Sequence, residues 1–202
     1  PNSRAADKDI TMAFPENAAF SFTEGQKAFD AGSFAVAEQA FRQAIVLLGK
    51  KPDCLADRLK VLNSLGHILV VQKKLDSALV VFQEAAETAE TLGERIKLAW
   101  QQANIGSIHR DLEQYDQARP YYQKALELFS QLSDTEGTAA QYANLGYLCT
   151  MTGDDAKALD WFQQASRAFT FLGHHEQAAL AERNISVLQH RLKNDQAQGR
   201  TP

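Results

Sequence analysis

Apolar and small residues recur along the chain at helical spacing, and the same set returns about every forty residues. Ala78, Phe82 and Ala85 are separated by four and three positions, so they lie on one stripe of a helix. The columns in this register are Leu65-Gly66, Ile105-Gly106 and Leu145-Gly146; Ala78, Ala118 and Ala158; Phe82, Tyr122 and Phe162; Ala85, Ala125 and Ala165; Leu92, Leu132 and Leu172; and Asn104, Asn144 and Asn184. A more divergent copy, with Gly25, Ala37, Phe41 and Ala44, precedes them.

This pattern predicts pairs of helices that repeat along the chain. Turn residues separate the predicted helices, which cover 17–30 and 34–48, 54–72 and 75–91, 94–111 and 115–131, and 135–151 and 155–171, with a ninth helix at 175–193. The repeats are therefore placed at 17–50, 54–92, 94–132 and 134–172, with a capping helix at 174–193, in an array spanning 17–193. The predicted fold class is all-α: a right-handed solenoid of four helix pairs and a C-terminal capping helix.

Both ends of the chain are polar. Residues 1–16 are expected to be flexible and carry no signal peptide, and residues 194–202 are expected to be a disordered tail. The start at Pro1 rather than Met suggests an excised or trimmed fragment. In the last helix, Glu182 and Gln189 replace residues that are apolar in the second repeat, which favours a cap with a wettable face.

The Leu-Gly pairs, the Gly32-Ser33-Phe34 turn and the Ala/aromatic/Ala triplets resemble the tetratricopeptide repeat. The forty-residue unit is similar to the longer-helix variety of kinesin light chain, Pins-type polarity adaptors and Rap-type regulators. Close packing explains the pattern, because Gly in the first helix would face Ala in the second while the aromatic ring fills the groove beside them. The chain departs from the family pattern at Glu24, where Leu is usual, and at Ser186, which replaces Gly.

Composition excludes several classes of function. The 202 residues include 21 Lys+Arg and 25 Asp+Glu, a formal net charge of −4, so the positive field needed to bind nucleic acid is missing. No apolar run approaches the ~20 residues of a membrane span. Two cysteines suit a reducing, cytoplasmic location; Cys149 is expected to be buried, and Cys54 to be more exposed.

No motif for catalysis or cofactor binding is present, so neither an enzyme nor a cofactor is expected. His174-His175-Glu176 is interpreted as a solvated helix start, because adjacent helical residues point about 100° apart and share a metal ion poorly. Function is therefore expected to reside in a surface.

The concave face of such an array is lined by the first helix of each pair. Asn is a mediocre helix former, so a column of three suggests a role, and a carboxamide can both donate to and accept from a peptide group. The resemblance implies that these Asn residues contact the main chain of a ligand, although each could instead bond a neighbouring helix or turn. The predicted peptide-binding residues are Asn63, His67, Trp100, Asn104, Ser107, Arg110, Asn144, Tyr147, Arg183, Asn184 and Arg191.

These observations predict a non-enzymatic scaffold that binds a peptide or protein segment in its groove. Lys60, Arg110, Arg183 and Arg191 outnumber Asp30 and Asp111 there, which favours an acidic ligand. The alternative is a regulatory or sensor module of a larger signalling protein, working through ligand binding or dimerisation. A homodimer through the N-terminal end is also predicted, from the cluster of Phe14, Phe20, Phe22 and Phe29.

Overall fold

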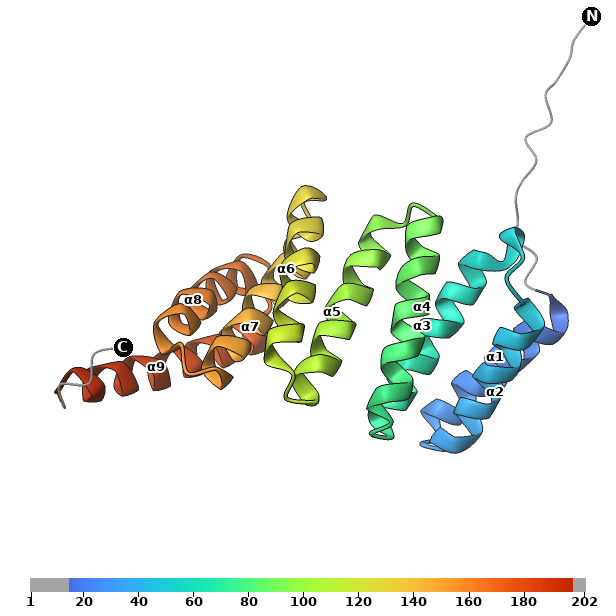
Figure 1. The fold of residues 1–202 in the computed structure, drawn as a ribbon, viewed down its shortest axis with the longest axis horizontal. Helices are drawn as coiled ribbons and strands as arrows, with labels where there is room; N and C mark the ends of the chain where they lie inside the picture. The colour runs from blue at the N-terminus through green and yellow to red at the C-terminus, as the bar shows by residue number, and fades with distance from the viewer. Residues whose placement is uncertain (1–14, 198–202) are drawn as a thin grey trace, which may run out of the picture.

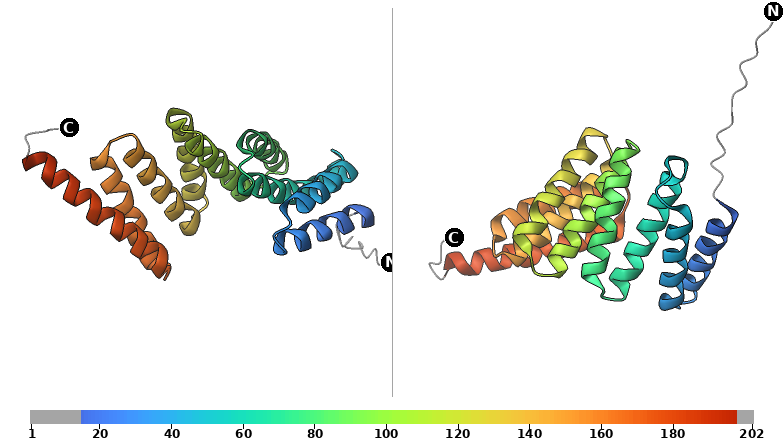
Figure 2. Two further views of the ribbon diagram at one scale, coloured as in Figure 1. Left: turned by 90° about the horizontal axis from the view of Figure 1, so that it is seen from below. Right: turned by 45° about the vertical axis from the view of Figure 1, so that its right-hand side comes forward.

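The structure, a computed structural model, describes residues 15–197. That part of the chain is helical and contains no strand: α1 (Glu16–Asp30), α2 (Phe34–Leu48), the 3₁₀ turn η1 (Pro52–Cys54), α3 (Leu55–Val71), α4 (Leu75–Thr91), α5 (Arg95–Asp111), α6 (Tyr115–Gln131), α7 (Thr135–Met151), α8 (Asp155–Phe171) and α9 (His175–Ala197). The helices follow one another in chain order along the long axis, each packed on the next (Figures 1 and 2). The predicted all-α solenoid is confirmed.

The predicted helix boundaries agree with the structure to within one residue, except at the end of α9. That helix continues to Ala197, so residues 194–197, predicted to belong to a disordered tail, are helical. Asn194 contacts His190 one turn earlier, with 3.2 Å between Nδ2 and Nδ1. Residues 198–202 of the expected tail and residues 1–14 of the expected flexible segment lie outside the described residues, whereas Glu16 already begins α1.

A single turn type joins successive helices everywhere except between α2 and α3. At the end of α5, for example, Glu113 N donates to Arg110 O and Gln114 N donates to His109 O, which is the Schellman pattern. The residue in the middle of each turn has positive φ, and it is glycine in four turns but Lys73, Glu113 and Ser133 in the other three. Seven of the eight connections between the described helices therefore share one backbone geometry, within pairs and between them.

Glu113→Gly is expected to stabilise the protein by about 0.5–1 kcal/mol, because glycine adopts positive φ without the steric cost that a Cβ adds. The measurement is the free energy of unfolding from urea denaturation. Gln117→Gly, inside α6, is the control and should destabilise by about 1 kcal/mol. A loss of stability in Glu113→Gly would contradict this account of the turn.

The junction between α2 and α3 is held by Arg58 instead of a turn. Gly49 has φ 59° and ψ −153°, so the chain leaves α2 without the usual pattern. Arg58 Nη1 donates to Ile45 O and to Gly49 O, both at 2.9 Å, and the guanidinium pairs with Glu84 of α4. Arg58 is 7% exposed. This buried cation therefore satisfies the Gly49 carbonyl and adds a second donor to the Ile45 carbonyl, which already accepts from Gly49 N.

The glycine in each first helix lies against an aromatic ring of the second helix. A Cβ built on Gly66 would lie 2.5 Å from Phe82 Cε1, and one built on Gly146 would lie 3.0 Å from the Phe162 ring. The expectation that this glycine faces alanine, with the ring beside that contact, was therefore wrong in detail. The face of the ring occupies the space that a side chain would need.

The outward face of α1 is mostly polar, which bears on the predicted homodimer. The positions that stack on the preceding repeat are buried in α3, α5, α7 and α9, but in α1 they hold Phe20, Glu24 and Lys27, of which the last two form an ion pair. Phe22 is buried against Phe41, and Phe29 packs on Phe34. Phe14 lies outside the described residues. The described part of this end thus exposes one large apolar side chain at a stacking position, Phe20, and the homodimer stays a prediction.

The opposite face, on α9, is polar as well. The positions that pack on the second helix in other repeats hold Glu182, Ser186 and Gln189 here, and all three are exposed. Ser186 also adds a side chain where the other repeats have glycine. This face of α9 therefore lacks the small and apolar residues that hold a helix partner elsewhere in the array.

The structure buries both cysteines, which confirms the expectation for one and corrects it for the other. Cys149 is fully buried, as expected. Cys54 was expected to be exposed and is buried, because η1 turns it inward at the start of α3. Arg119 Nη1 lies 3.8 Å from Cys149 Sγ, which leaves that thiol enclosed between α6 and α7.

Candidate functional site

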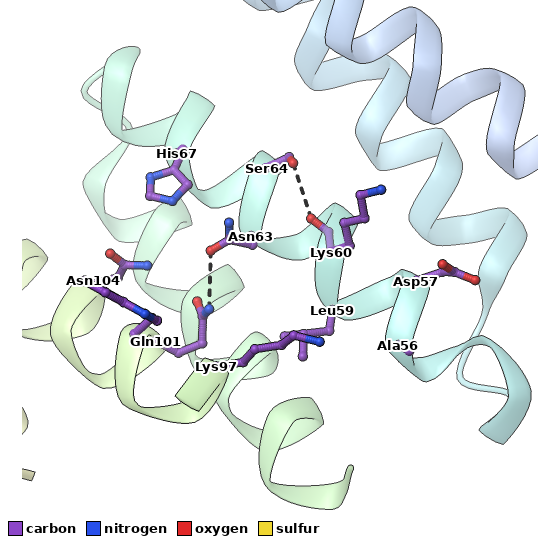
Figure 3. Close-up of a pocket in the computed structure, with 11 residues that line it drawn as sticks. Ala56, Asp57, Leu59, Lys60, Asn63, Ser64, His67, Lys97, Gln101 and Asn104 are labelled. Carbon is purple, nitrogen blue, oxygen red and sulfur yellow. Dashed lines mark hydrogen bonds between the residues drawn. The ribbon is translucent and has the colours of Figure 1, made fainter. Parts of the chain in front are cut away.

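A hollow of about 700 Å³ lies between α3 and α5 (Figure 3) and is called here the α3–α5 hollow. Asn63 and His67 are four residues apart on α3, and Trp100 and Asn104 are four apart on α5, so each pair shares one helix face. The structure thus brings together four of the predicted site residues. The full lining is Ala56, Asp57, Leu59, Lys60, Asn63, Ser64, His67, Lys97, Trp100, Gln101 and Asn104.

Three carboxamides form the polar part of this hollow. Gln101 Nε2 donates to Asn63 Oδ1 at 3.3 Å, which leaves both amide hydrogens of Asn63 available. Gln101 is 4% exposed, and its Oε1 is buried without a hydrogen-bond partner. The side chain of Asn104 makes no hydrogen bond with any residue of 15–197. The groups that the fold itself does not use and that a ligand could reach are therefore the amide hydrogens of Asn63 and the donors and acceptor of Asn104, whereas Gln101 Oε1 is buried.

Gln101 was missed by the sequence analysis. Its column holds Val61 in the second repeat, Gln141 in the fourth and Ala181 in α9, and all three are buried. The available signal was a polar residue at a stacking position, since a buried amide needs a partner.

The rings of Trp100 and His67 form two walls of the hollow, and each packs on an aromatic residue of the core. Trp100 packs edge-on against Phe129, with 4.8 Å between ring centroids, and remains 36% exposed. His67 packs edge-on against Phe82 at 5.4 Å. Desolvation lowers the pKa of His67, because its crowded setting disfavours the charged imidazolium. Near neutral pH the hollow therefore presents a neutral imidazole and an indole.

The charges at the hollow are two ammonium groups and one carboxylate. Lys60 lies on α3 with Nζ 4.9 Å from the centre of the Phe22 ring, and Lys97 pairs with Glu94 at 3.2 Å. Partial burial raises the pKa of Asp57, and the charge of Lys60 opposes that shift. The lining is thus slightly basic in a chain that is acidic overall.

Two further predicted residues lie on α5 but outside this hollow. Ser107 Oγ accepts a hydrogen bond from Tyr122 OH at 3.1 Å. Arg110 pairs with Asp111 at 2.9 Å between Nη2 and Oδ1. Both side chains therefore have partners inside the fold.

The remaining members of the Asn column are partly engaged by neighbouring residues. Asn144 Nδ2 donates to Gln141 Oε1 on its own helix at 3.1 Å. Asn184 Nδ2 donates to Tyr147 OH at 3.3 Å and so links α9 to α7. These bonds agree with the structural alternative for the column, and each amide keeps an oxygen that accepts nothing from residues 15–197.

The predicted residues nearest the C-terminal end of the array have separate surroundings. Tyr147 lines a small apolar pocket of about 100 Å³ between α7 and α9. Arg183 borders an open depression along α9. Arg191 Nε lies 3.0 Å from Asp155 Oδ2 and ties α9 to the start of α8. These three residues are not brought into the α3–α5 hollow.

Neither a membrane span nor a metal cluster emerges from residues 15–197. None of their helices has the length and hydrophobicity that crossing a bilayer requires. Their His, Cys, Asp and Glu side chains form no group of three or more that could hold a metal ion.

Comparison with known proteins agrees with the fold. Residues 98–170 match the family described as tetratricopeptide repeat. A protein described as STIP1 homolog from Dictyostelium discoideum is 30% identical over 97 residues, which are 48% of this chain and 17% of that protein.

Two solved structures extend the likeness to most of the described chain. Aspartyl phosphate phosphatase F from Bacillus subtilis has a TM-score of 0.79 at 18% identity, over 91% of this chain and 48% of that one. A Rap protein solved in complex with Competence and Sporulation Factor has a TM-score of 0.70 at 20% identity, over 91% of this chain and 52% of that one. The chain thus spans about half the length of these structures and a smaller share of the sequence relative.

Proposed function

We propose that the chain, whose residues 98–170 match the tetratricopeptide repeat, is a protein-interaction scaffold that holds an extended segment of a partner in the α3–α5 hollow. The observation that carries this proposal is the carboxamide cluster of Asn63, Gln101 and Asn104. The unused donors of Asn63 and the unused donors and acceptor of Asn104 match the alternating N–H and C=O groups of an extended main chain. Such contacts hold a backbone whatever its side chains are.

The rings and charges around the cluster add selectivity. Trp100 is a rigid, partly exposed aromatic group, which is typical of binding hot spots. Lys60 and Lys97 border the hollow and favour an acidic side chain on the part of the segment bound there. Ligand acidity and the participation of Asn144, Asn184, Arg183 and Arg191 belong to the same proposal.

Asn63→Ala combined with Asn104→Ala is expected to weaken peptide binding about ten- to a hundredfold, since each lost hydrogen bond contributes about 0.5–1.5 kcal/mol. The probe is a set of peptides selected from a phage-displayed library of random 12-residue sequences. Affinity is read from the emission of Trp100 in a Trp161→Phe background, which leaves one tryptophan of the two.

The control replaces Gln123 and Gln164, exposed amides on α6 and α8, with alanine. Its affinities should equal those of the parent protein. Selected peptides that bind both double variants equally well would remove the carboxamide cluster from the proposal, and failure to select any peptide would contradict peptide binding itself.

A regulatory or sensor array is the second candidate function. It is favoured by the fold likeness to the Rap protein solved with Competence and Sporulation Factor. Such a module would change shape or oligomeric state when its ligand binds. Small-angle scattering with and without a selected peptide separates the two functions, because a scaffold should keep the same radius of gyration and mass.

A further inference from the structure

A second hollow adjoins the first on the other side of α3. It has a volume of about 470 Å³ and is lined by Gln26, Phe29, Asp30, Phe41, Ser64 and His67. Ser64 and His67 also line the α3–α5 hollow, so the two sites share one wall. We call this second site the α1–α3 hollow.

The chemistry of the α1–α3 hollow is opposite to that of its neighbour. Its only charged lining residue is Asp30, an exposed carboxylate that pairs with no cation among residues 15–197. Asp30 is the last residue of α1, where the partial negative charge of the helix end adds to that of the carboxylate. No Lys or Arg lines this hollow, whereas Lys60 and Lys97 line the other.

An aromatic ring completes the surroundings of Asp30. Phe29, the preceding residue, is 40% exposed and is held in place by Phe34, with 5.8 Å between ring centroids. Phe41 contributes a second, buried ring to the lining. A carboxylate beside aromatic faces attracts an ammonium or guanidinium group through both charge and the ring quadrupole.

We propose that the α1–α3 hollow receives a Lys or Arg side chain of the same segment whose main chain lies in the α3–α5 hollow. This inference rests on the proposed function and names the kind of partner: a segment with a cationic residue at one end of the bound stretch. The charge of Asp30 carries it, because this carboxylate, unpaired within residues 15–197, lies beside the Phe29 and Phe41 rings in a hollow whose lining has no Lys or Arg.

His67 stands between the two hollows and does not oppose a cation. The pKa of His67 is lowered by desolvation, so the imidazole is neutral near pH 7. Gln26, on the other wall, supplies an uncharged amide that can accept a hydrogen bond from the bound cation.

The spacing within the ligand follows from the dimensions of a helix. The hollows lie on opposite sides of α3, and a helix with its side chains is about 10 Å across. An extended chain advances about 3.3 Å per residue. In the ligand, the cationic residue should therefore lie about three positions before or after the residue whose main chain the carboxamides bind.

The test compares peptides selected from the random 12-residue phage library on the whole chain and on three variants. The whole chain should enrich Lys or Arg at one fixed position. Asp30→Asn should abolish that enrichment and weaken the selected peptides about five- to tenfold. Asp30→Lys should select Asp or Glu at the same position. Asp160→Asn, an exposed carboxylate on α8, is the control with the same change in charge and should behave as the parent.

The outcomes separate this inference from the function on which it rests. Peptides that need Asn63 and Asn104 but show no cationic position, or bind Asp30→Asn unchanged, would overturn the α1–α3 hollow as a cation site and leave the scaffold intact. Failure to select any peptide would overturn both. Circular dichroism of Asp30→Asn and Asp30→Lys checks that the variants fold, which an exposed helix end permits.

Discussion

Arg58→Met should lower the free energy of unfolding by about 3 kcal/mol, since it removes a buried charge whose partners remain. Methionine keeps much of the volume of the arginine stem but donates no hydrogen bond. The carbonyl of Gly49 would then be unpaired at the end of α2, that of Ile45 would keep only its bond from Gly49 N, and Glu84 would lose the guanidinium. Urea denaturation followed by helical circular dichroism measures the loss.

Two further substitutions separate charge from geometry at this junction. Arg58→Lys retains the charge but lacks the planar fork that reaches two carbonyls and a carboxylate together, so it should recover less than half of the lost stability. Arg42→Met breaks an exposed ion pair with Glu38 on one helix and should cost under about 1 kcal/mol. Equal losses for Arg58→Met and Arg42→Met would show that Arg58 does not hold the junction.

Gly66→Ala should destabilise the protein by about 2–3 kcal/mol, because the added methyl group has no space beside the Phe82 ring. Helix propensity predicts the opposite sign, since alanine in a helix interior is favoured over glycine by about 0.5–1 kcal/mol. The nearest contact to the new Cβ would be 2.5 Å. Gly146→Ala, with 3.0 Å to the Phe162 ring, should cost less.

A double-mutant cycle identifies the ring as the cause. Phe82→Leu alone should destabilise by creating a cavity, but together with Gly66→Ala the loss should be smaller than the sum, because leucine leaves space for the methyl group. Additive losses, or a Gly66→Ala variant more stable than the parent, would contradict the proposed contact.

The fold was largely predictable because its determinants recur. A forty-residue register repeats the residues on the buried stripes, so helix positions could be read from spacing alone. Turns at Lys73, Glu113 and Ser133 were placed without glycine, since the register marked them. The role of Arg58 could not be predicted, because its partners lie 9 to 26 residues away and have no counterpart in the other repeats.

Site residues could be predicted from the sequence only where their position on one face of a helix is enough to place them. Asn63, His67, Trp100 and Asn104 were found because helical spacing places them on the faces that meet between α3 and α5. The shared Asn column did not reveal its different partners. Asn184 bonds Tyr147, whose column holds other residues in the earlier repeats. Asn144 bonds Gln141, although Asn104 does not bond the equivalent Gln101. Gln101 was not among the predicted residues, because its burial depends on contacts between helices that spacing along one helix does not show.

The polar faces of α1 and α9 determine how readily this protein could polymerise by mutation. Head-to-tail association of copies into a filament requires complementary surfaces on the two end helices. The described faces are instead hydrophilic, with Glu24 and Lys27 on α1 and Glu182 and Gln189 on α9. Phe20, which is 68% exposed on α1, is the exception among these positions. An apolar substitution on the described face of α9 would therefore be the change that most favours head-to-tail association of copies.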